Sequence, residues 1–438
     1  MSSDNKNNSS ELTKPLSGIK VLDLSAVISG PMCAALLADQ GADVIKVERV
    51  VKGDIQRHVG SSRGGLSGLF HVLNRGKQSL ALDLKSEKAR AVIFRLVEGM
   101  DVIIQNFRPG VVERLGLAWS DLQKINPRIV YLSINGFGAS GPDANKKAYD
   151  PIIQARSGIS WVQGDSGFEG YGNKKDETDG DDKFKRNNKT ANKSSRPEQV
   201  KHVLLDKLTA HQGAQAVTAA LFQRERNGQG RHIEISMLDV AVSFIWSDAA
   251  ADKILLGDNI DHRPPVRASG YLAKYKDDQW ISTIAVSDAE FQALCKSFNM
   301  QWLAEDPRFK TIQMRQRNRA EWRAVMEANI DEVAAGLTVN EAISLLSQNQ
   351  VPNGLAQNLD QLPNDEQVEH NKILVTTEHP VAGALREARP PPIVNGKASQ
   401  PAGPAPMVGQ HSRKILTDIG LEEEIDQLIA EGIVSTFE

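Results

Sequence analysis

Short apolar runs alternate with helical segments along the first 140 residues of the chain. The runs with the length and composition of buried strands cover 19–24, 43–48, 79–83, 101–105 and 128–134. Helical patterns separate them, one over 31–37 with proline in its first turn and one over 86–98. Strands that alternate with helices predict a doubly wound, mostly parallel, Rossmann-like α/β sheet.

The pattern changes further along the chain. Residues 1–14 hold almost no apolar side chains, and 165–199 are dense in Lys, Asp, Asn, Ser and Gly. We expect a disordered tail and a mobile surface insertion there, with a lid over the site as the alternative for the insertion. The large domain is predicted over 15–256. A β-rich stretch followed by helices predicts a second, smaller α+β domain over 257–349, and 350–438 is expected to return and complete the large domain with C-terminal helices.

Composition excludes several classes of function. The 438 residues carry a net charge of −3, which gives no basic field for nucleic acid or an anionic membrane. Two distant cysteines, Cys33 and Cys295, support neither a disulfide framework nor a Cys-based zinc site. No apolar run has the roughly 18 residues of a membrane span, and the polar N-terminus lacks the apolar core of a secretory signal. We therefore expect a cytoplasmic protein.

A carboxylate at the mouth of a helix rich in Ala and Gln is the most specific feature. Asp206 opens this helix, a basic turn ends it, and an alternating strand over 232–236 leads into a second helix near Met237. The helix dipole and the unpaired N–H groups at a helix N-terminus are expected to lower the pKa of such a carboxylate and keep it ionised. An ionised carboxylate is what nucleophilic attack on an acyl group requires. The alternative is that Asp206 serves only as a helix N-cap.

Polar and glycine-containing clusters follow four of the predicted strands, at 25–31, 48–49, 106–110 and 136–142. Open α/β sheets bind ligands at the carboxyl ends of their strands, so these clusters predict one shared crevice. The basic residues near these turns, which suit a polyanion such as a nucleotide phosphate, are Arg49, Arg57, Lys77, Lys85, Arg108, Arg114 and Lys147.

A nicotinamide dinucleotide is the first ligand to consider for this crevice. Glu48 ends the second strand, where a ribose-binding acid would lie. The preceding loop, AVISGP, holds a single glycine and no GxGxxG, which argues against a dehydrogenase. The nine histidines show no metal-ligand spacing, so we predict no metal.

With these residues in place, the chain resembles the class III coenzyme A transferases, a family that includes formyl-CoA and carnitine CoA-transferases and the related α-methylacyl-CoA racemases. The resemblance runs from about Leu16 to Ile433. Its marks, in order, are PLSGIKVLDLS, LADQGADVIKVER, GD…R, NRGKQSLALDLK, NFRPGV, INPRIVYLSINGFG, AYD and RERNGQGRHIEISMLD.

The resemblance implies that Asp206 is the nucleophile of a covalent relay that moves CoA from an acyl-CoA to a free carboxylic acid. It implies no required cofactor, because CoA is the substrate, and no partner beyond a second copy of the chain in an interlocked homodimer. The CoA contacts that it implies fall at Val27, Arg49, Leu82, Lys85, Asn106, Phe107, Arg114, Lys147 and Met237, with Phe107 near the adenine.

Two departures from the family bear on the reaction. Racemases of the family place a His directly before an Asp, and here Tyr149 stands before Asp150, so a two-base proton shuttle lacks a partner. Transfer is therefore favoured, with an acyl-CoA epimerase that uses Asp150 or Asp206 as base, or a non-catalytic CoA-binding protein, as alternatives. Ile28 stands where formyl-CoA transferase has a glutamine, which argues against oxalate or formate as substrates.

Overall fold

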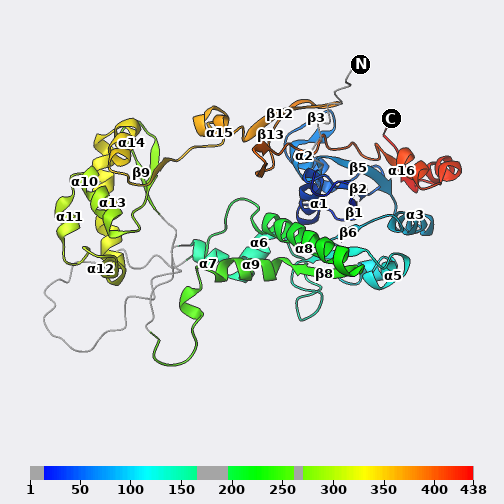
Figure 1. The fold of residues 1–438 in the computed structure, drawn as a ribbon, viewed down its shortest axis with the longest axis horizontal. Helices are drawn as coiled ribbons and strands as arrows, with labels where there is room; N and C mark the ends of the chain where they lie inside the picture. Colours follow the sequence, from blue (N-terminus) through cyan, green and yellow to red (C-terminus); the bar gives the residue numbers. More distant parts are fainter. Residues whose placement is uncertain (1–13, 165–195, 261–269, 438) are drawn as a thin grey trace, which may run out of the picture. The chain divides into compact units, whose positions relative to one another are not determined.

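The computed structural model describes residues 14–164, 196–260 and 270–437 (Figure 1). Nearly all of the predicted tail and of the predicted insertion at 165–199 lies outside the described residues. The chain divides into two compact units, one formed by Met1–Ser247 with Lys372–Glu438 and the other by Asp248–Asn371.

A seven-stranded sheet forms the centre of the first unit, in the order β16-β5-β2-β1-β6-β7-β8. Its strands are β1 (Lys20–Asp23), β2 (Asp43–Glu48), β5 (Lys77–Leu82), β6 (Val102–Gln105), β7 (Val130–Asn135), β8 (Arg231–Ser236) and β16 (Val434–Ser435). Every pairing among the first six is parallel, and only β16 runs antiparallel, against β5. The predicted mainly parallel α/β sheet is confirmed.

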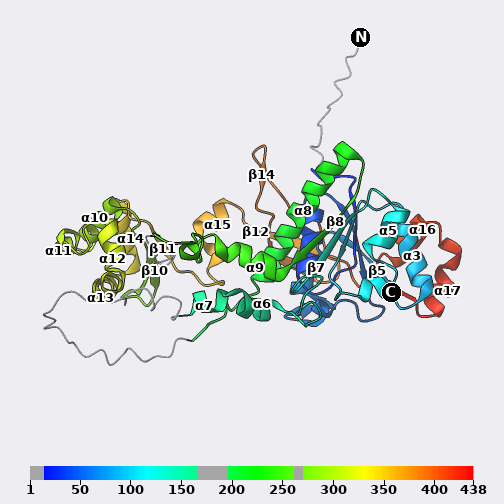
Figure 2. The same cartoon turned by 90° about the horizontal axis from the view of Figure 1, so that it is seen from below.

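Helices cover both faces of this sheet because successive strand residues point to opposite sides. Val21 packs into a core with α1 (Ser29–Asp39) and α8 (Leu205–Asn227). The next residue, Leu22, packs into a separate core on the other face. The helices of that second face are α3 (Glu87–Val97), α5 (Trp119–Ile125), α16 (Ser412–Asp418) and α17 (Ile425–Ala430). Figure 2 shows these four helices gathered on one side of the sheet and α8 on the other.

Short elements surround the sheet at the ends of its strands. They are β3 (Ser62–Arg63), β4 (Leu66–Ser67), α2 (Gly68–Asn74), α4 (Val111–Arg114), α6 (Asp150–Ser157), α7 (Ile159–Gln163), α9 (Met237–Trp246), the hairpin β12 (Leu374–His379) and β13 (Gly383–Ala388), and the pair β14 (Ile393–Val394) and β15 (Lys397–Ala398). Helix α1 begins after the turn that follows β1, and the residues that follow β2 lie at the same edge of the sheet, where the candidate site is built.

The second unit has its own sheet and its own core. Strands β9 (Tyr271–Lys274), β10 (Trp280–Thr283) and β11 (Asn353–Leu355) form an antiparallel sheet in the order β11-β10-β9. The main helices are α10 (Asp288–Ser297), α11 (Gln301–Glu305), α12 (Ile312–Arg317), α13 (Arg319–Gly336), α14 (Val339–Gln348) and α15 (Glu366–His370). The unit extends past the predicted 257–349 at both ends, and at its C-terminal side β11 pairs with β10.

Within the ranges that the structure describes, no helix combines the length and the hydrophobicity needed to cross a bilayer.

Candidate active site

The carboxyl ends of the parallel strands meet at one edge of the sheet, and the turns beyond them carry the residues that the sequence marks for CoA. The order β5-β2-β1-β6 puts four of these turns side by side. Leu82 ends β5 with Lys85 just beyond, Arg49 follows β2, Val27 lies in the turn after β1, and Asn106 and Phe107 follow β6. Arg114 ends α4, Lys147 precedes α6 and Met237 begins α9 directly after β8.

The basic residues of this edge fall into two groups. Arg49, Lys85, Arg108, Arg114 and Lys147 are exposed. In the described part of the chain, none of these five side chains forms an ion pair with an acidic side chain. Their positive charges are therefore available to an anionic ligand.

Arg57 and Lys77 differ from that group, because both are buried in ion pairs. Arg57 binds Glu48 at 2.6 Å, and Lys77 binds Asp23 at 2.7 Å. The expectation that these two cations would meet a ligand phosphate is therefore wrong. Each one instead stabilises the buried ends of the strands below the turns.

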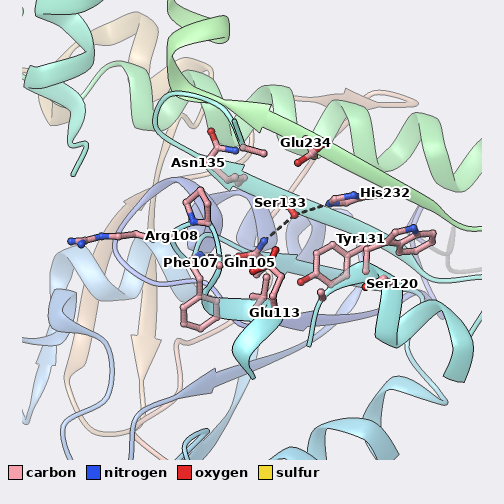
Figure 3. A pocket seen from close by; sticks show the side chains of 17 residues that line it. Gln105, Phe107, Arg108, Glu113, Ser120, Tyr131, Ser133, Asn135, His232 and Glu234 are labelled. Atoms are coloured by element: carbon pink, nitrogen blue, oxygen red, sulfur yellow. Dashed lines mark hydrogen bonds between the residues drawn. The ribbon is translucent and has the colours of Figure 1, made fainter. Parts of the chain in front are cut away.

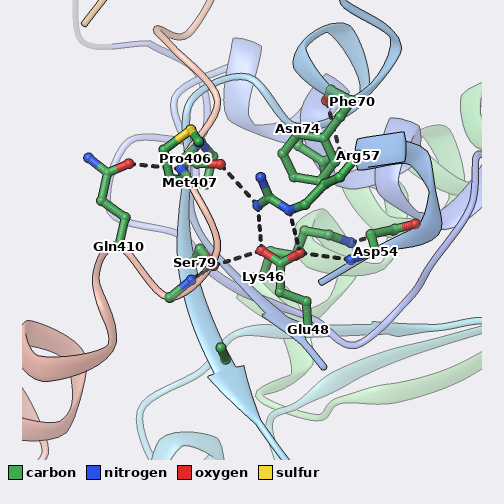
Figure 4. A network of polar contacts seen from close by, with 12 residues as sticks. Lys46, Glu48, Asp54, Arg57, Phe70, Asn74, Ser79, Pro406, Met407 and Gln410 are labelled. Atoms are coloured by element: carbon green, nitrogen blue, oxygen red, sulfur yellow. Dashed lines mark hydrogen bonds and ion pairs between the residues drawn. The ribbon is translucent and has the colours of Figure 1, made fainter. Parts of the chain in front are cut away.

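Glu48 is the centre of this buried polar network (Figure 4). Its carboxylate accepts hydrogen bonds from Arg57 Nε at 2.9 Å and from Ser79 Oγ at 2.7 Å. The Arg57 guanidinium also donates to the carbonyl of Pro406 at 3.0 Å, which ties the C-terminal segment to the second strand. Since these donors occupy both oxygens of Glu48, this carboxylate is not placed to bind a ribose. A nicotinamide dinucleotide would therefore lack the acidic residue that the sequence suggested for it.

The turn after β1 is clamped by side chains from two neighbouring segments. Asn106 accepts from the backbone N–H of Ala26 at 2.9 Å and donates to the Ala26 carbonyl at 2.7 Å. Asp54 accepts from the backbone N–H of Val27 at 3.2 Å. Lys46 completes the clamp, because its ammonium pairs with Asp54 at 3.1 Å. Val27 itself has φ of 73°, a left-handed conformation that is unfavourable for a β-branched residue.

Asp206 is the second residue of α8 and is almost completely buried, with 8% of its surface exposed. It does not cap its own helix, so the N-cap interpretation is wrong. The cap comes from Asp150, whose Oδ2 accepts from the backbone N–H of Leu205 at 2.6 Å and of Asp206 at 3.1 Å. Gln154 fixes Asp150 in place by donating to its other oxygen at 2.6 Å.

Burial raises the pKa of Asp206 to about 6, and the nearby Asp150 carboxylate adds to the rise. Hydrogen bonds from the hydroxyl and the backbone of Ser29, the first residue of α1, oppose the rise. The predicted lowering of the pKa is therefore wrong in direction, because the N–H groups at the start of α8 are directed at Asp150. The carboxylate still loses its proton in about nine molecules out of ten at pH 7.

A cavity of about 420 Å³ lies at the ends of β6, β7 and β8, next to the Phe107 turn (Figure 3). A chain of hydrogen bonds crosses it. The Phe107 N–H donates to Gln105 Oε1 at 2.8 Å, and Gln105 Nε2 donates to Ser133 Oγ at 2.9 Å. Ser133 Oγ lies 2.9 Å from His232 Nε2. Burial lowers the pKa of His232, which favours the neutral ring that accepts the Ser133 proton, and Trp119 stacks on this ring.

Neither Tyr149 nor Asp150 is placed as a second base for proton transfer. The Tyr149 side chain is 63% exposed, and Asp150 is committed to the cap of α8. In the described ranges, no group of three or more His, Cys, Asp and Glu side chains is arranged to hold a metal ion.

Sequence reasoning did not find Ser29, Lys46 and Asp54 as parts of this site. Asp54 belongs to the GD…R motif, which could have drawn attention to it. Ser29 falls within the cluster predicted at 25–31 and Lys46 within the LADQGADVIKVER motif, but neither pattern indicates what the single residue does, because its role depends on partners that lie far away along the chain.

Comparisons with known proteins agree on one family. The family model described as CoA-transferase family III matches residues 16–412. An acyl-CoA transferase of Fusarium pseudograminearum is 30% identical over 436 residues, which cover 96% of this chain and 88% of that protein. Succinyl-CoA:glutarate CoA-transferase of Mus musculus is 29% identical and covers 97% of this chain and 91% of its own length. The crystal structure of a CAIB/BAIF family protein from Brucella suis superposes with a TM-score of 0.73 at 26% identity, over 93% of this chain and all of that one.

Proposed function

The chain belongs to CoA-transferase family III, and on that premise we propose that it moves coenzyme A between carboxylic acids through covalent intermediates on Asp206. The observation that carries the proposal is a buried, ionisable carboxylate at the start of α8, held by Ser29 at the start of α1. Both helices begin at the edge of the sheet where the turns marked for CoA lie.

The relay balances without any outside reactant. An Asp206 oxygen attacks the thioester carbonyl of the donor, the C–S bond breaks, and CoA leaves as a thiolate from an acyl-aspartyl anhydride. The thiolate then attacks the Asp206 carbonyl, which gives an aspartyl-CoA thioester and releases the donor acid. An acceptor carboxylate attacks this thioester and forms a second anhydride. The returning thiolate attacks the acceptor carbonyl of that anhydride and regenerates the Asp206 carboxylate.

The electrostatics of Asp206 suit this chemistry. A carboxylate with a pKa near 6 is ionised at neutral pH, and it is a stronger nucleophile than one with the usual pKa near 4. Asp150 already binds the first N–H groups of α8, so these cannot stabilise the oxyanion formed on attack. In the first turn of α1 the Ser29 N–H is bound to Asp206, Pro31 has no N–H and Met32 donates to Ile28, so the N–H of Gly30 is the donor that we assign to that charge.

The CoA portion of the substrate is assigned to the edge of the Rossmann-like sheet. The exposed cations Arg49, Lys85, Arg114 and Lys147 suit the phosphates, and Phe107 suits the adenine. The clamped turn at Val27 and Asn106, with Leu82 at the end of β5 and Met237 directly after β8, completes the set of contacts.

An interlocked homodimer is part of the proposal. Helix α9 is strongly apolar in sequence, yet only Met237 and Ala241 of its ten residues are buried. Phe244 and Trp246 leave about half of their surface open, at 51% and 46%. Large apolar side chains that lie together on a surface mark an interaction site, and a second copy of this chain is the occupant that we propose for it.

Transfer is favoured over epimerisation because one base is present where two are needed. Asp150 is held by three hydrogen bonds and Tyr149 points to solvent. Epimerisation would exchange the α-proton of the acyl-CoA with solvent. Deuterium incorporated from D₂O into recovered acyl-CoA, in the absence of an acceptor acid, would favour the epimerase alternative.

Mass spectrometry of the intact protein tests the covalent relay. The protein is incubated with a panel of acyl-CoAs, with and without hydroxylamine, beside Asp206→Asn and the control Glu225→Gln, which changes an exposed acid on the same helix. We expect an adduct on the peptide that contains Asp206 in the unmodified protein and in the control, and no adduct in Asp206→Asn. Binding of CoA without any adduct or turnover would instead indicate a non-catalytic CoA-binding protein.

A further inference from the structure

A second cavity, of about 360 Å³, lies between α1, α2 and the start of α8. Its walls are almost entirely hydrocarbon. The apolar side chains that form them include Ile28, Met32, Leu69, Leu73 and Val203. No acidic residue contributes to the lining, and its charged residues are Lys207 and Arg75. An apolar cavity with cationic groups at its border suits a ligand that joins a hydrocarbon chain to an anionic group.

Two residues of the cavity wall are direct chain neighbours of Ser29 and Asp206. Ile28 directly precedes Ser29, which hydrogen bonds to Asp206. Lys207 directly follows Asp206 in the first turn of α8. Neither Asp206 nor Ser29 lines the cavity, but each has a direct chain neighbour in its wall, so one end of a ligand there lies one residue along the chain from the proposed nucleophile.

The two cations differ in their partners. The Lys207 ammonium lies 3.3 Å from His202 Nδ1, and in the described part of the chain it forms no ion pair with a carboxylate. Arg75 is already neutralised, because Asp39 binds it at 2.6 Å and Glu387 lies 3.9 Å away. The cavity thus offers one available positive charge, beside Asp206, and no available charge at its other border.

We propose that this cavity binds the hydrocarbon tail of the acid substrate and that the chain acts on aliphatic monocarboxylic acids, with the reacting carboxylate held by Lys207. This inference rests on the proposed role of Asp206. A dicarboxylic acid would place its second carboxylate among leucine and methionine side chains, where no free cation compensates it, and burial of an unpaired carboxylate is strongly unfavourable. The substrate class therefore differs from that named for the mouse relative, which is a succinyl-CoA:glutarate enzyme.

Acceptor specificity tests the inference with the full-length protein. Values of kcat/KM are measured for acetate, butyrate and hexanoate beside succinate and glutarate, with one acyl-CoA donor throughout. Each buried CH₂ group is worth about a fourfold gain, so hexanoate is expected to exceed acetate by at least tenfold. Glutarate is expected to fall below butyrate. A preference for either dicarboxylate, or equal values along the monocarboxylate series, would overturn the proposal.

A pair of variants locates the effect in the cavity. Val72→Phe adds bulk to a partly exposed residue of the wall, and Val51→Phe adds the same bulk to a surface residue outside it. We expect Val72→Phe to lower kcat/KM for hexanoate at least fivefold relative to acetate, and Val51→Phe to leave this ratio unchanged. Because the ratio is taken within one enzyme, a loss of folded protein cancels. An unchanged ratio in Val72→Phe would place the acyl chain elsewhere.

The adduct on Asp206 keeps this proposal separate from the one on which it rests. An adduct without any dependence on chain length defeats only the cavity assignment. The absence of an adduct and of transfer with every acid defeats the role of Asp206 and the cavity proposal together.

Discussion

Asp150 accepts a hydrogen bond from the backbone N–H of Asp206 at 3.1 Å, so one buried acid caps the helix that carries another. The two carboxylates also repel each other, which contributes to the raised pKa of Asp206. Asp150 therefore has two separable effects, one on the stability of the helix start and one on the charge of the proposed nucleophile.

Asp150→Asn separates these effects, because an amide oxygen still accepts hydrogen bonds but carries no charge. We expect the pKa of Asp206 to fall and the acidic limb of kcat/KM to move to lower pH. Asp150→Ala loses the cap as well and should destabilise the protein by about 1 kcal/mol. The measurements are pH–rate profiles and urea unfolding. An acidic limb that stays in place in a folded Asp150→Asn protein would contradict the assignment.

The pH dependence of the unmodified enzyme follows from Asp206. Only the ionised carboxylate attacks, and its pKa is about 6, so adduct formation should rise through pH 6 and level off above about pH 7. The rate of adduct formation from acyl-CoA alone is the right measurement, because it avoids titration of the acceptor acid. A rate that stays constant between pH 5 and 8 would show that another group limits the reaction.

The raised pKa also predicts a cost in stability. A buried carboxylate whose pKa is higher in the folded protein than in the unfolded chain destabilises the fold when it is ionised. This cost is absent below pH 4, grows between pH 4 and 6, and is complete above pH 6. Asp206→Asn removes it, so we expect the variant to be inactive yet more stable by up to ~3 kcal/mol at pH 7.5, with little gain at pH 4. Denaturant unfolding at both pH values checks this, and Glu225→Gln should show no such gain.

The strands were predictable from the sequence, and much of the chemistry at their ends was not. An apolar run such as 101–105 is read directly because both faces of a central parallel strand are buried. The pKa of Asp206 could not be read in this way, because it depends on burial and on Asp150, which lies 56 residues earlier. Lys77 was misread for the same reason, since its partner Asp23 is 54 residues away. Local sequence patterns determine where helices and strands form. The charge state of a residue depends instead on the residues that the fold brings into contact with it.

The chain of hydrogen bonds from His232 to Phe107 predicts that its loss weakens the binding of acyl-CoA and leaves the chemical step unchanged. Ser133→Ala removes the acceptor of Gln105, and Gln105 is then free to leave the Phe107 N–H. We expect the KM for acyl-CoA to rise about fivefold, which corresponds to one hydrogen bond, with kcat nearly unchanged. Ser120→Ala is the matched control, because Ser120 lines the same cavity but does not belong to the chain of hydrogen bonds (Figure 3). A fall in kcat with unchanged KM would instead indicate a role near the reacting atoms.

The clamp on Val27 predicts that one substitution rescues another. Asp54 holds the Val27 N–H in a turn where Val27 has a left-handed backbone, which costs a β-branched residue about 1–2 kcal/mol. Asp54→Asn weakens the pairing with the buried Lys46, so the turn is expected to relax and the KM for acyl-CoA to rise. Val27→Gly removes the steric cost of the left-handed conformation.

In the Asp54→Asn background, Val27→Gly should therefore restore most of the loss in KM, while the loss in stability from the disturbed Lys46 pair remains. Val51→Gly is the control, because Val51 has a similar φ of 66° but lies on the surface outside this clamp. It should leave the KM of Asp54→Asn unchanged. If both glycines rescue equally, the effect comes from general flexibility. If neither glycine rescues, Asp54 affects CoA binding by a mechanism other than the conformation of Val27. The left-handed conformation of Val27 is then a consequence of the fold and makes no contribution to binding.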